Sequence, residues 1–158
     1  MNTVKLLVCD IDGTLTDGKL YIGENGELFK AFNVKDGYGL VYILPTMNIT
    51  PVIITLRVSK IVENRAKELK IKDVYQGITD KTTKLQEILR QYGYTFENVA
   101  YIGDDLNDLD CMRQCALKGC PADAAAEIKA IADFVCTRNG GAGAVREFIE
   151  WIRSRISC

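Results

Sequence analysis

Short apolar runs alternate with amphipathic stretches over most of the chain. Residues 4–9 form the first apolar run, which has the length and the Leu and Val content of a buried strand. Further strands are expected at residues 51–55, 73–76, 99–102, 116–119 and 134–136. Helices are expected near residues 36–45 and at residues 58–69, 81–91, 106–115, 124–132 and 144–156.

This alternation of strands and helices predicts an α/β fold. Repeated βα units of this length give a doubly wound, mostly parallel, Rossmann-like sheet with helices on both faces. One insert interrupts the pattern, because residues 19–23 and 28–32, separated by Glu24-Asn25-Gly26-Glu27, are typical of a β-hairpin. A length of 158 residues is near the usual domain size, so we expect one domain over residues 1–158.

The first predicted strand leads into an acidic loop at residues 10–18, Asp-Ile-Asp-Gly-Thr-Leu-Thr-Asp-Gly. Asp10 and Asp12 are two residues apart, so both side chains can project to the same side of the strand end. Crowded carboxylates repel unless a cation or a shared proton lies between them, and such oxygen ligands suit Mg²⁺. A carboxylate can also act as a nucleophile through an aspartyl-phosphate.

Two other interpretations apply to this loop. Aspartates are common in solvated turns, and that interpretation stays open for the loop taken alone. A Ca²⁺ loop counted from Asp10 would need glycine and glutamate at its sixth and twelfth positions, which are Leu15 and Tyr21. The sequence therefore disfavours calcium.

A second acidic cluster, at residues 103–108, follows the strand expected at residues 99–102. Alone it is most simply a helix N-cap, but two acidic clusters at two strand ends favour a divalent-cation site. Thr55 ends another strand and could donate to a phosphoryl oxygen, and Lys81, at a loop-to-helix junction, is either solvated or offsets phosphate charge. A phosphoreceiver domain is disfavoured, because its phosphate-accepting aspartate should stand where Thr55 does.

Composition narrows the chemistry further. The chain has no histidine, which excludes mechanisms that depend on imidazole. Its six cysteines lie mostly in apolar segments, so reduced core thiols are favoured over a zinc site. The near balance of 20 basic and 21 acidic residues predicts neither a nucleic acid nor a membrane as partner. With no apolar run of about 18 residues and no signal-peptide pattern, a cytoplasmic protein is expected.

The long motifs resemble those of the 3-deoxy-D-manno-octulosonate 8-phosphate phosphatases, capless members of the haloacid dehalogenase superfamily. The resemblance runs from about residue 4 to residue 152. It rests on residues 10–18, 32–39 (Phe-Asn-Val-Lys-Asp-Gly-Tyr-Gly), 54–55, 81, 103–108 and 140–147 (Gly-Gly-Ala-Gly-Ala-Val-Arg-Glu). One departure is Leu56, where many relatives have Gly, and the larger side chain can change the local loop shape or the specificity.

The resemblance implies roles for the acidic residues. Asp10 would be the nucleophile and Asp12 the general acid and base, while Thr55 and Lys81 would hold the phosphoryl group. The implied cofactor is Mg²⁺. Its implied ligands are the Asp10 side chain, the Asp12 carbonyl and Asp104, with Asp105 and Asp108 behind them.

The resemblance also implies an acidic sugar phosphate as substrate, in lipopolysaccharide biosynthesis. Arg57 directly follows Thr55, and a guanidinium matches a carboxylate in bidentate geometry. Related nononate phosphatases have glutamate at this position, so Arg57 favours the octulosonate. The substrate-binding residues implied are Asp12, Asn33, Lys35, Asp36, Arg57, Arg65 and Lys81.

A homotetramer is expected as well. The chain has no room for a cap domain, and the hairpin at residues 19–32 carries apolar residues that could pair between subunits. The resemblance implies tetramers of this kind, with Arg65 reaching into a neighbour's site. Three alternatives stay open: a phosphatase for a nine-carbon sugar-acid phosphate, a transphosphorylating mutase, and a non-catalytic assembly module related to the C-terminal domain of sialic-acid-activating enzymes.

Overall fold

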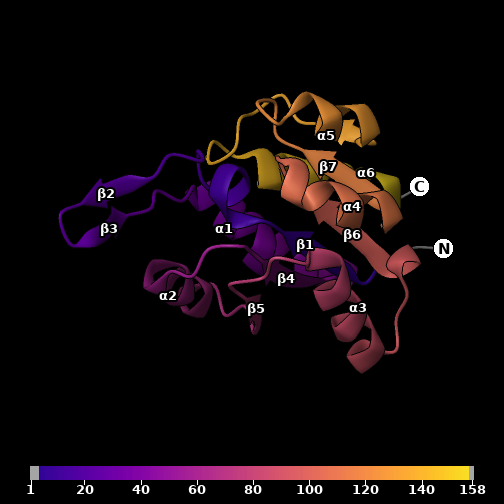
Figure 1. Ribbon diagram of the computed structural model, residues 1–158. Helices are drawn as coiled ribbons and strands as arrows, with labels where there is room; N and C mark the ends of the chain where they lie inside the picture. Colours follow the sequence, from indigo (N-terminus) through magenta and orange to yellow (C-terminus); the bar gives the residue numbers. More distant parts are fainter. Residues whose placement is uncertain (1–3, 157–158) are drawn as a thin grey trace.

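The structure, a computed structural model, describes residues 4–156 and is built on one parallel sheet. Its six strands lie in the order β5-β4-β1-β6-β7-β8, with every neighbouring pair parallel (Figure 1). The strands are β1 (Leu6–Cys9), β4 (Thr50–Ile54), β5 (Asp73–Tyr75), β6 (Val99–Ile102), β7 (Leu117–Cys120) and β8 (Phe134–Val135). The expected doubly wound α/β fold is confirmed.

Helices cover both faces of this sheet, and each face has its own apolar core. Successive residues of β1 point to opposite faces, so Leu7 and Cys9 lie in one core while Leu6 and Val8 lie in the other. The helices are α1 (Val34–Tyr38), α2 (Lys60–Glu68), α3 (Lys81–Tyr92), α4 (Leu106–Gln114), α5 (Ala126–Ile131) and α6 (Ala144–Ile156). Helices α2 and α6 pack on the first core, and α3, α4 and α5 on the second.

The helix expected near residues 36–45, with Pro45 at its end or just beyond, is shorter than predicted: α1 ends at Tyr38. Two irregular helical turns follow it, at Gly39–Ile43 and Leu44–Met47, and Pro45 lies inside the second of these. Proline is tolerated there because the first residues of a helical turn need no amide donor. Helix α2 begins later than expected, at Lys60 rather than residue 58, because Ser59 has extended backbone angles.

The hairpin consists of β2 (Tyr21–Gly23) and β3 (Gly26–Phe29) and extends away from the rest of the molecule (Figure 1). The second strand begins two residues earlier than residue 28, because Gly23 pairs with Gly26 and leaves only two residues in the turn. Gly26 has a φ of 109°, which glycine adopts without strain. The tightening places Tyr21 over Phe29, with ring centroids 4.3 Å apart.

The topology gathers the polar loops at one edge of the sheet. Strand β1 lies between β4 and β6, and Cys9 is in register with Ile53 and with Ile102. The residues that follow these three strands therefore emerge side by side, as expected for ligand sites in open α/β sheets. Within residues 4–156 no cap domain interrupts the fold, and no helix there is long and apolar enough to cross a membrane.

Candidate active site

Three aspartates converge where β1 and β6 end. One carboxylate oxygen from each of Asp10, Asp104 and Asp108 can be chosen so that all three lie within 4.8 Å of one another. Asp10 and Asp108 are buried, and the Thr14 hydroxyl donates to Asp104 at 2.9 Å. Gly13 permits this approach, because a Cβ there would lie 2.0 Å from an Asp104 oxygen. The loop at residues 10–18 is thus folded directly against the second acidic cluster.

Lys81 joins this cluster from the first turn of α3. Its Nζ donates to Asp10 Oδ1 at 2.8 Å and to Asp108 Oδ1 at 2.7 Å, and the residue is only 2% exposed. The Tyr101 hydroxyl donates to the same Asp108 oxygen at 2.7 Å. Lys81 is therefore a partner of the acidic residues rather than a solvated helix residue.

The electrostatics show that one lysine does not balance this cluster. Burial, together with the charge of Asp108, raises the pKa of Asp10 to about 6 despite the opposing effect of Lys81. Burial and the charges of Asp10 and Asp108 raise the pKa of Asp104 to about 8. Three crowded, oxygen-only donors, among them Asp10 and Asp104 with raised pKa values, fit a small divalent cation such as Mg²⁺.

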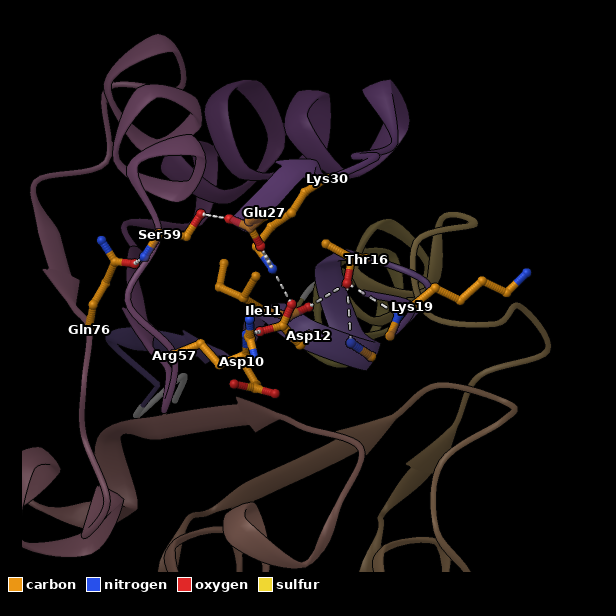
Figure 2. A network of polar contacts seen from close by, with 12 residues as sticks. Asp10, Ile11, Asp12, Thr16, Lys19, Glu27, Lys30, Arg57, Ser59 and Gln76 are labelled. Atoms are coloured by element: carbon orange, nitrogen blue, oxygen red, sulfur yellow. Dashed lines mark hydrogen bonds and ion pairs between the residues drawn. The ribbon is translucent and has the colours of Figure 1, made fainter. Parts of the chain in front are cut away.

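Asp12 makes different contacts. Its Oδ1 accepts from Lys30 Nζ at 2.5 Å, and Arg57 Nε lies 3.9 Å from its Oδ2 (Figure 2). Asp12 lies in the turn Ile11–Leu15, which follows β1 and includes Gly13 at a φ of 94°. Its carboxylate is thus held between two cations rather than in the acidic cluster.

A solvent-accessible pocket of about 400 Å³ opens over these groups. Its lining residues are Asp10, Asp12, Thr55, Leu56, Arg57, Asp105, Leu106 and Asn107. The structure therefore brings Asp10, Asp12, Thr55 and Arg57 to one pocket, and Lys81 and Asp104 reach it through their contacts with Asp10 and with the acidic loop. Leu56, the departure from the family pattern, stands about half exposed at this pocket.

Four of the expected substrate-binding residues lie elsewhere in this chain. Asn33 accepts from the backbone N–H of Lys35 and so caps α1, while the Lys35 side chain is exposed. Asp36 is buried and accepts from the backbone N–H of Arg146 at 2.8 Å, in the first turn of α6. Burial raises the pKa of Asp36 to about 6.

The fourth of these residues, Arg65, lies on α2. It pairs with Glu68 at 2.8 Å and lies over the Phe32 ring, 5.7 Å from its centroid. None of the four residues lines the pocket around Asp10, so their binding of substrate stays a prediction.

Sequence reasoning missed Lys30 and underrated Asp108. Asp108 lies in the first turn of the helix expected at residues 106–115, and this position directly after the acidic strand end could have indicated that it faces the same site. The structure places Asp108 in the cluster itself, while Asp105 is exposed and caps α4 through the backbone N–H of Leu106. Lys30 directly follows β3, and nothing in its local sequence indicated its contact with Asp12.

Five cysteines lie buried with free thiols, as the composition suggested. They are Cys9, Cys111, Cys115, Cys120 and Cys136, and the sixth, Cys158, lies outside the described residues. Burial raises the pKa of Cys9 and of Cys136 far above the usual thiol range. These thiols are packing groups rather than metal ligands.

Comparison with known proteins identifies the class to which this fold and site belong. Residues 53–149 match the model of the haloacid dehalogenase-like hydrolase family. The 3-deoxy-D-manno-octulosonate 8-phosphate phosphatase of Salmonella typhi is 46% identical over 91% of this chain and 76% of its own length. The Yersinia pestis phosphatase of the same name is 44% identical over 94% of this chain and 79% of its own length.

Solved structures give the same result. The octulosonate 8-phosphate phosphatase of Moraxella catarrhalis, in complex with magnesium, phosphate and KDO, superposes with a TM-score of 0.92 at 39% identity, over 97% of this chain and 87% of that one. The cobalt-bound octulosonate 8-phosphate phosphatase of Haemophilus influenzae superposes with a TM-score of 0.93 at 36% identity, over 99% of this chain and 91% of that one. The chain therefore belongs to the haloacid dehalogenase-like hydrolases and, within them, to the 3-deoxy-D-manno-octulosonate 8-phosphate phosphatase family.

Proposed function

We propose that this protein is a Mg²⁺-dependent phosphatase that hydrolyses 3-deoxy-D-manno-octulosonate 8-phosphate to the free sugar acid and phosphate. The observation that carries the proposal is the buried Asp10 carboxylate, which lines an open pocket and is bonded to Lys81 beside two further aspartates. This arrangement occurs in a chain 46% identical to an enzyme of that name. The reaction belongs to lipopolysaccharide biosynthesis.

The residues divide the chemistry as follows. An oxygen of Asp10 attacks phosphorus in line, and the bond to the sugar oxygen breaks as Asp12 gives that oxygen a proton. Asp12 then takes a proton from the water that hydrolyses the aspartyl-phosphate, which returns Asp10 to its carboxylate form and Asp12 to its acid form. Thr55 and Lys81 hold the phosphoryl oxygens.

Mg²⁺ fits the oxygen donors of Asp10 and Asp104, with the Asp12 carbonyl as a third proposed ligand and Asp108 beside them. When bound, it supplies positive charge where the transferring phosphoryl group carries negative charge. Lys81 adds a fixed positive charge from the protein side. Together these groups favour a transition state that needs little covalent help from the protein beyond Asp10.

Arg57 is proposed to bind the carboxylate of the substrate. Its side chain is 41% exposed at the pocket, beside Asp12. A charge-assisted, bidentate contact is worth about 1.5–3 kcal/mol. We therefore expect Arg57→Glu to raise KM for the octulosonate phosphate by roughly 10- to 100-fold. The KM for p-nitrophenyl phosphate, an ester without a carboxylate, should change by less than about threefold.

Steady-state phosphate release measures this effect, with Arg113→Glu on the exposed side of α4 as the matched charge reversal. Equal KM changes for the two esters would contradict the assignment. A panel that includes a nine-carbon sugar-acid phosphate tests the substrate itself. A higher kcat/KM for the nononate ester would show that the protein is a nine-carbon sugar-acid phosphatase. Transfer of the phosphoryl group to a second sugar would show that it is a mutase.

The working enzyme is proposed to be a homotetramer, assembled through the hairpin at residues 19–32. Ile22, Leu28 and Phe29 are at least half exposed there, at 61%, 63% and 50%. A two-stranded ribbon is marginal unless its faces are packed, and an uncapped site leaves the aspartyl-phosphate in water. In this arrangement Arg65 would turn from Glu68 toward a neighbour's site.

We expect Ile22→Asp to dissociate the assembly and to lower kcat/KM at least about tenfold, because a buried carboxylate at an apolar contact costs several kcal/mol. Light scattering at the assay concentration, alongside phosphate release, measures both effects. Asn25→Asp places the same charge in the hairpin turn and should change neither. A fully active monomer would overturn the proposed assembly.

The protein is also proposed to work as a single domain in the cytoplasm, without a nucleic acid or a membrane as partner. One sheet with an apolar core on each face supports the single domain. The five buried free thiols suit a reducing compartment.

A further inference from the structure

Lys30 makes the most unusual contact outside the acidic cluster. It directly follows β3 in the hairpin segment, yet its side chain is only 2% exposed, and its Nζ lies 2.5 Å from Asp12 Oδ1 and 2.9 Å from Glu27 Oε1. Isolated buried lysines are costly, so a buried ammonium is found where carboxylates hold it. Lys30 therefore takes its position from Asp12 on one side and from Glu27 on the other.

Glu27 is itself braced by the body of the protein. The Ser59 hydroxyl, just before α2, donates to Glu27, and the Ser59 backbone N–H donates to Gln76 Oε1 at 2.8 Å (Figure 2). The contacts form a chain from the residues after β5, through the hairpin, to Asp12. Such a chain restricts where the Lys30 ammonium can lie, and with it one oxygen of Asp12.

The two oxygens of Asp12 have different surroundings. Oδ1 is taken by Lys30, whereas Oδ2 lies on the side of Arg57, which lines the pocket. A carboxyl group bonded through one oxygen cannot rotate freely, so the direction of the other is fixed. Accurate placement of an acid matters because misplacement by about 1 Å can cost 100-fold in rate.

We propose that Lys30 is a positioning residue that holds one oxygen of Asp12 so that the other meets the leaving oxygen of the substrate. The proposal rests on the proposed function, because it assumes that Asp12 is the acid of phosphoryl transfer. It goes further by assigning the hairpin a part in the chemistry of its own subunit. Lys30 itself does not touch the reacting atoms.

The test compares two esters that differ in how much they need an acid. A sugar alkoxide leaves poorly without a proton, whereas p-nitrophenolate leaves readily. The ratio of kcat/KM for the octulosonate ester to kcat/KM for p-nitrophenyl phosphate reports this need, because kcat/KM covers the steps up to transfer onto Asp10. General acid catalysis contributes about 10²- to 10⁴-fold, and positioning accounts for part of it.

For Lys30→Met we expect kcat/KM to fall about 30-fold on the sugar ester and less than about threefold on the aryl ester. Lys30→Arg keeps the positive charge, so its ratio of the two kcat/KM values should lie close to that of the wild type. Lys19→Met removes an exposed lysine at the base of the same hairpin and should leave the ratio unchanged. Thermal unfolding and light scattering establish that each variant is folded and assembled.

Equal losses on the two esters, or no loss on either, would overturn the positioning role. If Lys30→Met does not fold, Glu27→Gln loosens the brace instead, and an unchanged ratio in that variant overturns the proposal equally well. If the wild-type protein releases no phosphate from the octulosonate ester, the proposed substrate fails. The ratio measured with glucose 6-phosphate then still tests Lys30.

Discussion

Replacing Asp10 by Asn is expected to lower phosphate release by at least about 10⁴-fold, the largest effect of any single substitution in this protein. The amide cannot form the acyl-phosphate on which both half-reactions depend. The fold should survive, because the amide oxygen can still accept from Lys81, whose ion pair with Asp108 is untouched. Asp10→Asn should therefore lose phosphate release without losing stability.

Phosphate release by purified Asp10→Asn, with thermal unfolding in parallel, measures this expectation. Asp110→Asn is the matched control, because it changes an exposed aspartate of α4 in the same way. Intact mass confirms that the asparagine has not deamidated. Activity within about tenfold of the wild type would remove Asp10 from the role of nucleophile.

Removing Mg²⁺ is expected to have the second largest effect, a loss of at least about 10³-fold in kcat that returns when the ion is restored. The reason lies in the imbalance of Asp10, Asp104 and Asp108 against the one charge of Lys81. Activity that persists after thorough chelation would contradict a metal-dependent reaction. Calcium is the matched control ion, since its size and coordination differ from those of magnesium.

Stability gives a second readout of the same site. The pKa values of Asp10 and Asp104, about 6 and about 8, are raised from an ordinary value of 3.8. Between the ordinary value of 3.8 and the raised value of about 8, the folded metal-free protein retains protons that the unfolded chain releases. Its free energy of unfolding therefore falls as the pH rises through this range. Bound Mg²⁺ offsets that loss, and its stabilising effect should therefore grow toward pH 8.

At about 100 times its dissociation constant, Mg²⁺ should raise Tm by roughly 5–10 °C. Thermal unfolding with and without one fixed Mg²⁺ concentration, about 100 times the dissociation constant at pH 8, is measured at about pH 5.5 and about pH 8 and shows whether the gain increases with pH. Asp104→Asn should lose most of the gain, and Asp110→Asn should keep it. A gain that is equal at both pH values would contradict the crowding of these carboxylates.

Much of the fold could be read from local pattern. Apolar runs and helical spacing located every strand of the main sheet, and every helix except the end of α1, to within a few residues, because those features depend on neighbours along the chain. The errors fell where local signals compete. Pro45 looked like a helix end but lies within a helical turn beyond α1, and the hairpin turn has two residues rather than the four expected at residues 24–27.

The core of the site was also within reach of the sequence. Asp10, Thr55 and Asp104 each follow a strand, and the carboxyl ends of neighbouring parallel strands meet at one edge of a sheet. Their meeting therefore required only the correct strand assignment and the parallel topology that βα alternation implies. The position of Lys81 could not be predicted in this way, because its burial depends on how α3 packs against the sheet.

The sequence by itself thus determined the strands, the helices and the edge at which the acidic residues gather, since these depend on short-range periodicity. Only the tertiary structure decided which partners the charged side chains take. Lys30 meets Asp12 across 18 residues, and Asp36 meets the first turn of α6 across 110. Such contacts depend on the relative placement of whole elements, which no local pattern encodes.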